Sequence, residues 1–177
     1  MEHSGKSDRI ENLLTHLSRL PQKILSLHGR GDLTEFVLRD LCHKQCFNLK
    51  KAAFFVDNPD FNCLKGVAGF CQKENPTVCD FLWDHPEKFM ARIQESEFNQ
   101  KVRDIWLPSL QKVEESQDYV VKSVAQMLDM KNPHSCSLAV KYGNNGMLVF
   151  EKENLQDSVA DEHFSHGLSL LGFCPVY

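Results

Sequence analysis

The residues from Leu49 to Phe70 constrain the fold of this chain more than any other stretch. Ala52–Val56 is a short, continuous apolar run, and the turn-forming residues Asp57-Asn58-Pro59-Asp60 follow it directly. This order is typical of a buried strand that is closed by a turn. The next apolar run, Leu64–Phe70, predicts a second strand that returns antiparallel to the first, although its two glycines weaken the β pattern.

A second strand pair is predicted near the C-terminus. Ser137–Tyr142 and Met147–Glu151 are rich in strand-forming residues, and the four turn-forming residues Gly143-Asn144-Asn145-Gly146 join them. Apolar residues at helical spacing predict a helix over Leu33–Phe47, before the first strand pair, and another over Asp157–Leu171, after the second. Antiparallel strands flanked by helices indicate an α+β fold.

Residues 1–31 are predicted to form an N-terminal amphipathic helical segment, and residues 32–177 a single α+β domain. The apolar residues of the segment recur at helical spacing: Ile10, Leu13, Leu14, Leu17, Leu20 and Ile24. Pro21 predicts a kink or the start of a second helix. We expect the face from Ile10 to Leu27 to pack against a second copy, which would make the protein a homodimer.

The central residues, Ser96–Met130, carry a long helical pattern. Pro108 and the polar stretch Glu114–Asp118 could interrupt it, because proline breaks helices and Asp118 could cap a new one. The pattern therefore predicts a long central helical segment and leaves open whether it is one kinked helix or two helices.

Charge and composition argue against several classes of protein. A net charge of -4 disfavours a nucleic-acid surface, which requires clustered Lys and Arg. The apolar runs are short and the N-terminus is polar, so we expect neither a signal peptide nor a membrane span, and a cytoplasmic protein. Seven cysteines in such a chain are expected to be reduced, and mostly small buried apolar residues.

Two parts of the chain resemble GAF-type sensory domains. The order of helix, apolar strand, Asp/Asn/Pro turn and second strand over Leu33–Phe70 is similar to the start of a GAF domain, and Ser137–Leu171 is similar to its later hairpin and closing helix. The resemblance implies an antiparallel sheet with helices on one face and a ligand cavity on the other. It also implies a sensory or regulatory module without catalysis. The signature of the cyclic-nucleotide-binding branch is not reproduced, because Asp157 stands where that branch has Phe.

Four aromatic residues are candidates for the lining of such a cavity: Trp83, Phe89, Trp106 and Tyr142. They lie on or between the elements that would enclose it, and an apolar pocket with a few polar groups suits an organic ligand. The alternative is that these side chains fill the core.

A metal- or thiol-dependent enzyme is the alternative function. Cys42 and Cys46 are four residues apart, so on a helix they share a face and could bind Zn²⁺ with two further ligands from Cys63, Cys71 or Cys79. Such an enzyme would also be expected to carry a thiol with a lowered pKa.

A second alternative is a protein-interaction module. In that case the helices of Ser96–Met130 would present a binding surface, and the fold would contain no ligand cavity.

Overall fold

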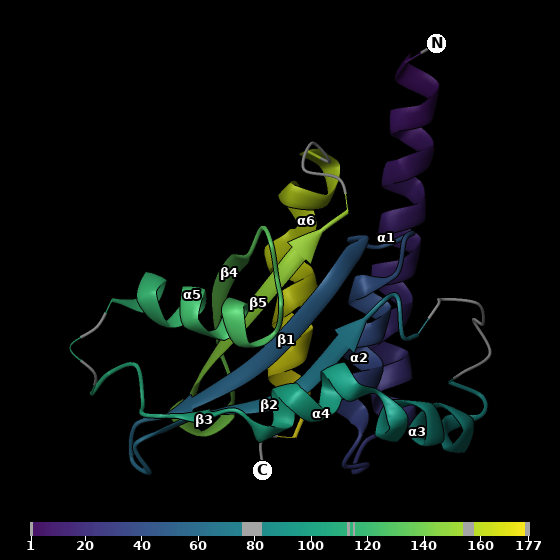
Figure 1. Cartoon of the computed structure of the whole chain (residues 1–177). Helices are drawn as coiled ribbons and strands as arrows, with labels where there is room; N and C mark the ends of the chain where they lie inside the picture. Colours follow the sequence, from purple (N-terminus) through teal and green to yellow (C-terminus); the bar gives the residue numbers. More distant parts are fainter. Residues whose placement is uncertain (1, 76–82, 113, 115, 154–157, 176–177) are drawn as a thin grey trace.

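The computed structural model describes residues 2–75, 83–112, 114, 116–153 and 158–175. Within these residues the chain folds into a five-stranded antiparallel sheet with helices on both faces, as Figure 1 shows. The strands are β1 (Leu49–Asn58), β2 (Cys63–Cys71), β3 (Trp106–Leu107), β4 (His134–Ala139) and β5 (Asn145–Lys152). Their order across the sheet is β3-β2-β1-β5-β4. The predicted α+β class is confirmed.

Both predicted strand pairs form. β1 pairs antiparallel with β2 in a register that runs from Lys51 opposite Cys71 to Asn58 opposite Cys63, with one irregularity after Phe54. β4 pairs with β5, and β5 in turn pairs with β1, so the two hairpins join into one sheet. The turn η2 (Lys141–Gly143) connects β4 to β5.

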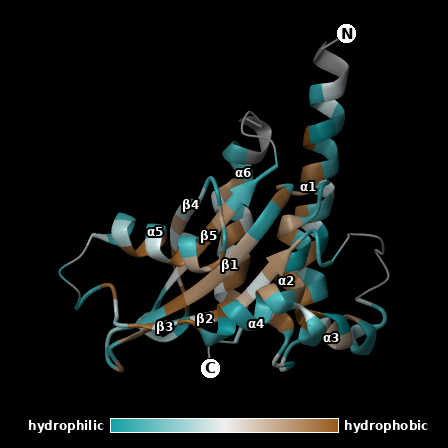
Figure 2. Ribbon diagram, viewed as in Figure 1, coloured by the Kyte–Doolittle hydropathy of each residue, from teal (hydrophilic) through white to brown (hydrophobic). Residues whose placement is uncertain are grey.

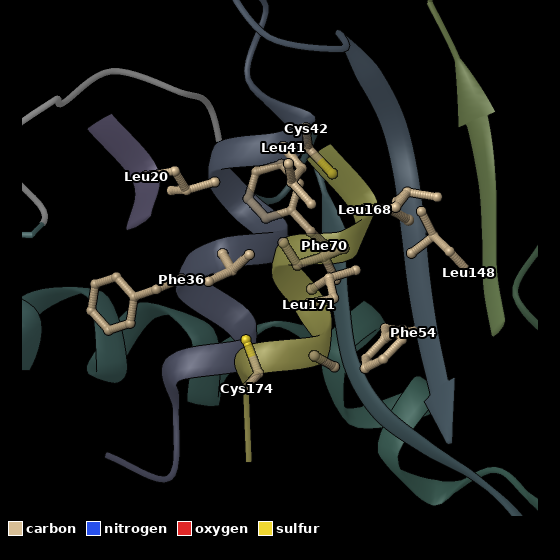
Figure 3. Close-up of a cluster of buried hydrophobic side chains, with 14 of the residues drawn as sticks. Leu20, Phe36, Leu41, Cys42, Phe54, Phe70, Leu148, Leu168, Leu171 and Cys174 are labelled. Atoms are coloured by element: carbon tan, nitrogen blue, oxygen red, sulfur yellow. The ribbon is translucent and has the colours of Figure 1, made fainter. Parts of the chain in front are cut away.

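The first face of the sheet is covered by helices from both ends of the chain. These elements are α1 (Glu2–Ser26), α2 (Leu33–Cys42), α6 (Ser158–Ser169) and the short turn η3 (Leu170–Phe173), with α3 (Pro86–Glu95) packed beside α2. Figure 3 shows Phe54, Leu148, Leu168 and Leu171 in the space between the sheet and the C-terminal helical segment. All residues of α2 are buried, because the sheet lies on one side of it and other helices cover the rest.

The second face is covered by α4 (Glu97–Asp104) and α5 (Gln117–Met127). The central segment forms two helices, one of the two arrangements that its pattern left open, but it is not helical throughout, because a short edge strand separates them. Trp106 and Leu107 pair with Lys65 and Leu64 of β2, and Pro108 follows directly. Proline lacks the N–H that a continuing helix needs, whereas it is tolerated beside an edge strand.

α4 packs unusually close to β2, and two glycines permit this. A Cβ atom on Gly66 would lie 1.8 Å from the carbonyl oxygen of Val102, and one on Gly69 would lie 2.7 Å from the Val102 side chain. The backbone N–H of Gly69 donates to the buried Oδ1 of Asn99 at 2.8 Å. The glycines that weaken the strand pattern in the sequence are therefore the residues that admit the helix.

The N-terminal helix α1 packs on the domain. It continues through Pro21, so no second helix begins there. Leu13, Leu20 and Ile24 are buried in the same core as Phe36 of α2. The first turns of α1 extend beyond the sheet, and Figure 2 shows that its hydrophobic residues concentrate in the part that packs on the domain. The homodimer stays a prediction, and much of the face assigned to it is covered by the protein itself.

Candidate functional site

A depression opens on the first face of the sheet, at the end that the helices leave uncovered. Lys65 lies opposite Val56 on one side and opposite Trp106 on the other, so these three side chains share that face. The depression has a volume of about 400 Å³. Its lining residues are Val56, Asn58, Phe61, Cys63, Lys65, Val67, Trp106 and Asn144. This volume falls in the range of small-molecule sites.

Two large aromatic side chains border this depression and remain exposed to solvent. Phe61, in the turn between β1 and β2, is 79% exposed, and Trp106 on β3 is 64% exposed. Single exposed apolar residues are common, but two aromatic side chains beside one apolar hollow form a surface that a ligand can cover.

Hydrogen bonds fix the backbone on both sides of the depression. Asn58 Oδ1 accepts from the N–H groups of Asp60 and Phe61, which holds the turn that carries the Phe61 ring. Asn62 Oδ1 accepts from the N–H of Ser109 at 3.3 Å, three residues beyond Trp106 in the chain.

A second hydrogen bond joins the β1–β2 turn to the chain that follows β3. The buried carboxylate of Asp57 accepts from the N–H of Leu110 at 3.2 Å. The β1–β2 turn and the chain beyond β3 are therefore tied together, and the backbones that carry the two rings are held in place before any ligand binds.

The depression carries little charge. The Nζ atom of Lys65 lies 5.6 Å from the centre of the Trp106 ring, a cation–π contact. Asn58 and Asn144 contribute side-chain amides, and none of the described residues that line the depression carries a carboxylate.

The four aromatic residues predicted to line a cavity do not come together. Trp83 and Phe89 are buried against Phe36, with ring centres 5.0 and 4.2 Å from the Phe36 ring, so both fill the core. Trp106 lines the depression described above. Tyr142 is 89% exposed and borders a separate hollow of about 200 Å³ near the C-terminus.

The sequence interpretation missed Phe61 and Lys65. The available signal was the position of Phe61, an aromatic side chain between Asp60 and Asn62 in a predicted turn, where polar residues are usual. Lys65 gave no signal, because it belongs to this site only through its pairing with Val56 and Trp106.

Of the cysteines in the alternative metal site, Cys42, Cys46 and Cys71 lie near one another, whereas Cys63 lies apart from them. Cys42 and Cys46 are buried, and burial raises the pKa of the Cys42 thiol, with Cys46 and Cys71 adding to the effect. Cys63 lies at the opposite end of β2 from Cys71. Cys79 is outside the described residues. In the part of the chain that is described, no group of three or more His, Cys, Asp or Glu residues is placed to hold a metal ion.

A second depression, of about 450 Å³, lies between α2, α3 and α4 and is lined by both polar and apolar side chains. One lining residue is Glu35 in the first turn of α2, whose side chain is only 2% exposed and pairs with the Arg103 guanidinium at 2.7 Å. Burial raises the pKa of the Glu35 carboxyl, and the nearby Arg103 opposes that shift. This ion pair links α2 to α4.

Comparisons with known proteins identify no relative of this chain. No protein-family model, no curated protein and no solved structure matches it. Among the described residues, no helix is both long enough and apolar enough to cross a bilayer.

Proposed function

We propose that this protein is a cytoplasmic regulatory binding module of GAF-like type, which recognises a small organic molecule without transforming it. The observation that carries the proposal is the depression of about 400 Å³ bordered by the exposed rings of Phe61 and Trp106. Its apolar lining and a few amide groups are typical of a site for an organic ligand. The resemblance of the two strand pairs to GAF domains favours a sensory role.

The proposed site differs in place from the cavity that the GAF resemblance implies. α4 and α5 cover the second face of the sheet, and Phe55, Val102 and Val124 fill the space beneath them. The ligand would instead bind at the uncovered end of the first face.

The alternatives have less support. A thiol enzyme would need an accessible thiolate, whereas burial raises the pKa of Cys42, Cys46 and Cys174, the last to about 12. A protein-interaction module is favoured by the exposed rings but does not require a hollow between them.

Indole N–H signals in an NMR titration test the proposal. The chain has two tryptophans, one exposed at the site and one, Trp83, whose Nε1–H donates to Asp40 at 2.8 Å in the core. A neutral aromatic probe, 2-naphthalenemethanol, should shift the Trp106 signal saturably and leave the Trp83 signal unchanged. Phe61→Ala should weaken binding by about fivefold, since one aromatic contact is worth about 1 kcal/mol.

The matched control is Phe173→Ala, which removes an exposed ring outside the depression and should leave binding unchanged. A shift of the Trp106 signal that does not saturate, or equal effects of the two substitutions, would contradict the proposal.

A further inference from the structure

We propose that the ligand of this depression is a small aromatic anion, whose negatively charged group pairs with Lys65. This inference rests on the proposed function and names the chemical class of the ligand. It follows from the distribution of charge around the hollow and from the geometry of the two rings.

The described residues that line the depression carry positive charge and no negative charge. Lys65 is the charged residue among the lining side chains, and the two amides, Asn58 and Asn144, are neutral. Among the described residues Lys65 forms no ion pair, and its ammonium group instead lies over the Trp106 ring. A ligand carboxylate in the depression could therefore pair with the Lys65 ammonium group without breaking an existing ion pair.

The remaining lining is suited to a flat apolar body. Val56 and Val67 come from the sheet and form an apolar surface. The exposed rings of Trp106 and Phe61 border this surface. Aromatic side chains favour stacked or edge-to-face contacts with another ring. A ligand that covers both rings and places its charge at Lys65 would use both the apolar and the charged groups of the lining.

Lys65 is held close to this position by its strand. It is paired on both sides, with Val56 in β1 and with Trp106 in β3, so the Cα atom has little freedom. The ammonium group can move from the Trp106 ring to a bound carboxylate by a change of rotamer alone. A charge-assisted hydrogen bond to the bound carboxylate can replace the cation–π contact of the free protein.

Two probes of the same shape and different charge test the inference: 2-naphthoate, which is ionised at neutral pH, and neutral 2-naphthalenemethanol. Both are titrated into the full chain at low ionic strength, with the Trp106 indole signal as the readout. We expect 2-naphthoate to bind about tenfold more tightly, a difference that corresponds to one charge-assisted hydrogen bond. Added salt should reduce the preference, because it screens the charge of the half-buried Lys65.

Substitutions assign the preference to one residue. Lys65→Met should abolish the preference and retain binding of the neutral probe, whereas Lys65→Arg should keep it. Lys122→Met removes the same charge from an exposed position on α5 and should change nothing.

The outcomes separate the two proposals. Equal affinity for the two probes, or a preference that survives Lys65→Met, would overturn the inference and leave the binding function in place. Binding of neither probe would overturn both proposals and would point to a macromolecular partner at this surface.

Discussion

At the scale of single residues, the protein keeps several charges inside its helical layers, and each has a partner of opposite sign. The buried carboxylate of Asp40 accepts from Lys23 at 3.0 Å, Arg39 at 2.8 Å and the Trp83 indole at 2.8 Å. Glu35 is paired with Arg103, which is itself 56% exposed. A buried carboxylate costs stability unless it is paired, so removal of one partner is more harmful than the loss of an ordinary surface ion pair.

The Glu35–Arg103 pair gives a pH-dependent prediction. Burial raises the pKa of Glu35 in the folded state, so the folded protein holds the carboxyl proton more tightly than the unfolded chain does. This difference stabilises the folded state at low pH, and the stabilisation is lost as the pH rises through the folded-state pKa. Arg103→Ala removes the partner and raises the pKa further. We expect a loss of about 2 kcal/mol in the free energy of unfolding at pH 8 and a smaller loss at pH 5.

Urea unfolding at the two pH values measures this difference. Arg92→Ala is the control, because Arg92 is an exposed residue of the neighbouring helix α3. A loss for Arg103→Ala that is the same at both pH values would show that Glu35 does not titrate as described.

At the scale of elements, the contact between α4 and β2 determines how the second face of the sheet is closed. The helix approaches so closely that the backbone of Val102 lies against Gly66, and the N–H of Gly66 donates to the carbonyl of Ile105 at 3.0 Å. This contact also leads the chain directly into β3, and therefore places Trp106 at the sheet edge beside Lys65.

Gly66→Ala tests this contact. The added Cβ would collide with a backbone oxygen, which cannot move without displacing α4, so we expect a loss of more than about 3 kcal/mol in the free energy of unfolding. Gly31→Ala is the matched control, because nothing lies within 4 Å of a Cβ at that position. Equal midpoints of urea unfolding for the two variants would refute the close contact.

At the scale of the whole molecule, the N-terminal helix belongs to the core of the domain. Leu13, Leu20, Ile24 and Leu27 are buried together with side chains of α2 and α6. The guanidinium of Arg9 donates to the carbonyls of Gln45 and Cys46, beyond the C-terminal end of α2. These contacts indicate that residues 1–31 and residues 32–177 depend on each other for stability.

Two truncations measure that dependence. Deletion of residues 1–27 uncovers the apolar surface beneath α1, and because each buried Leu or Ile side chain contributes about 1.5–3 kcal/mol, we expect a loss of at least about 4 kcal/mol. Deletion of residues 1–8 removes turns in which Gly5, Lys6, Ser7 and Asp8 are exposed, and should leave the urea midpoint almost unchanged. If the protein without residues 1–27 unfolds at the same midpoint, α1 is a separate appendage.

What the sequence by itself determined was local. The strand at Ala52–Val56 with its turn, the returning strand and the C-terminal hairpin could all be predicted, because alternation, apolar runs and turn residues act over a few neighbouring positions. The central segment could not, since Trp106 and Leu107 leave the helical pattern only by pairing with residues about forty positions earlier.

The candidate site was decided by the tertiary structure for the same reason. Trp83 and Trp106 are chemically equivalent in the sequence, yet Asp40 and Phe36 hold the first in the core and the sheet edge exposes the second. Phe61, Lys65 and Trp106 become neighbours only through strand register. The burial of each tryptophan and the pairing of β2 with β3 depend on contacts between distant parts of the chain, and the local patterns at these residues did not determine them.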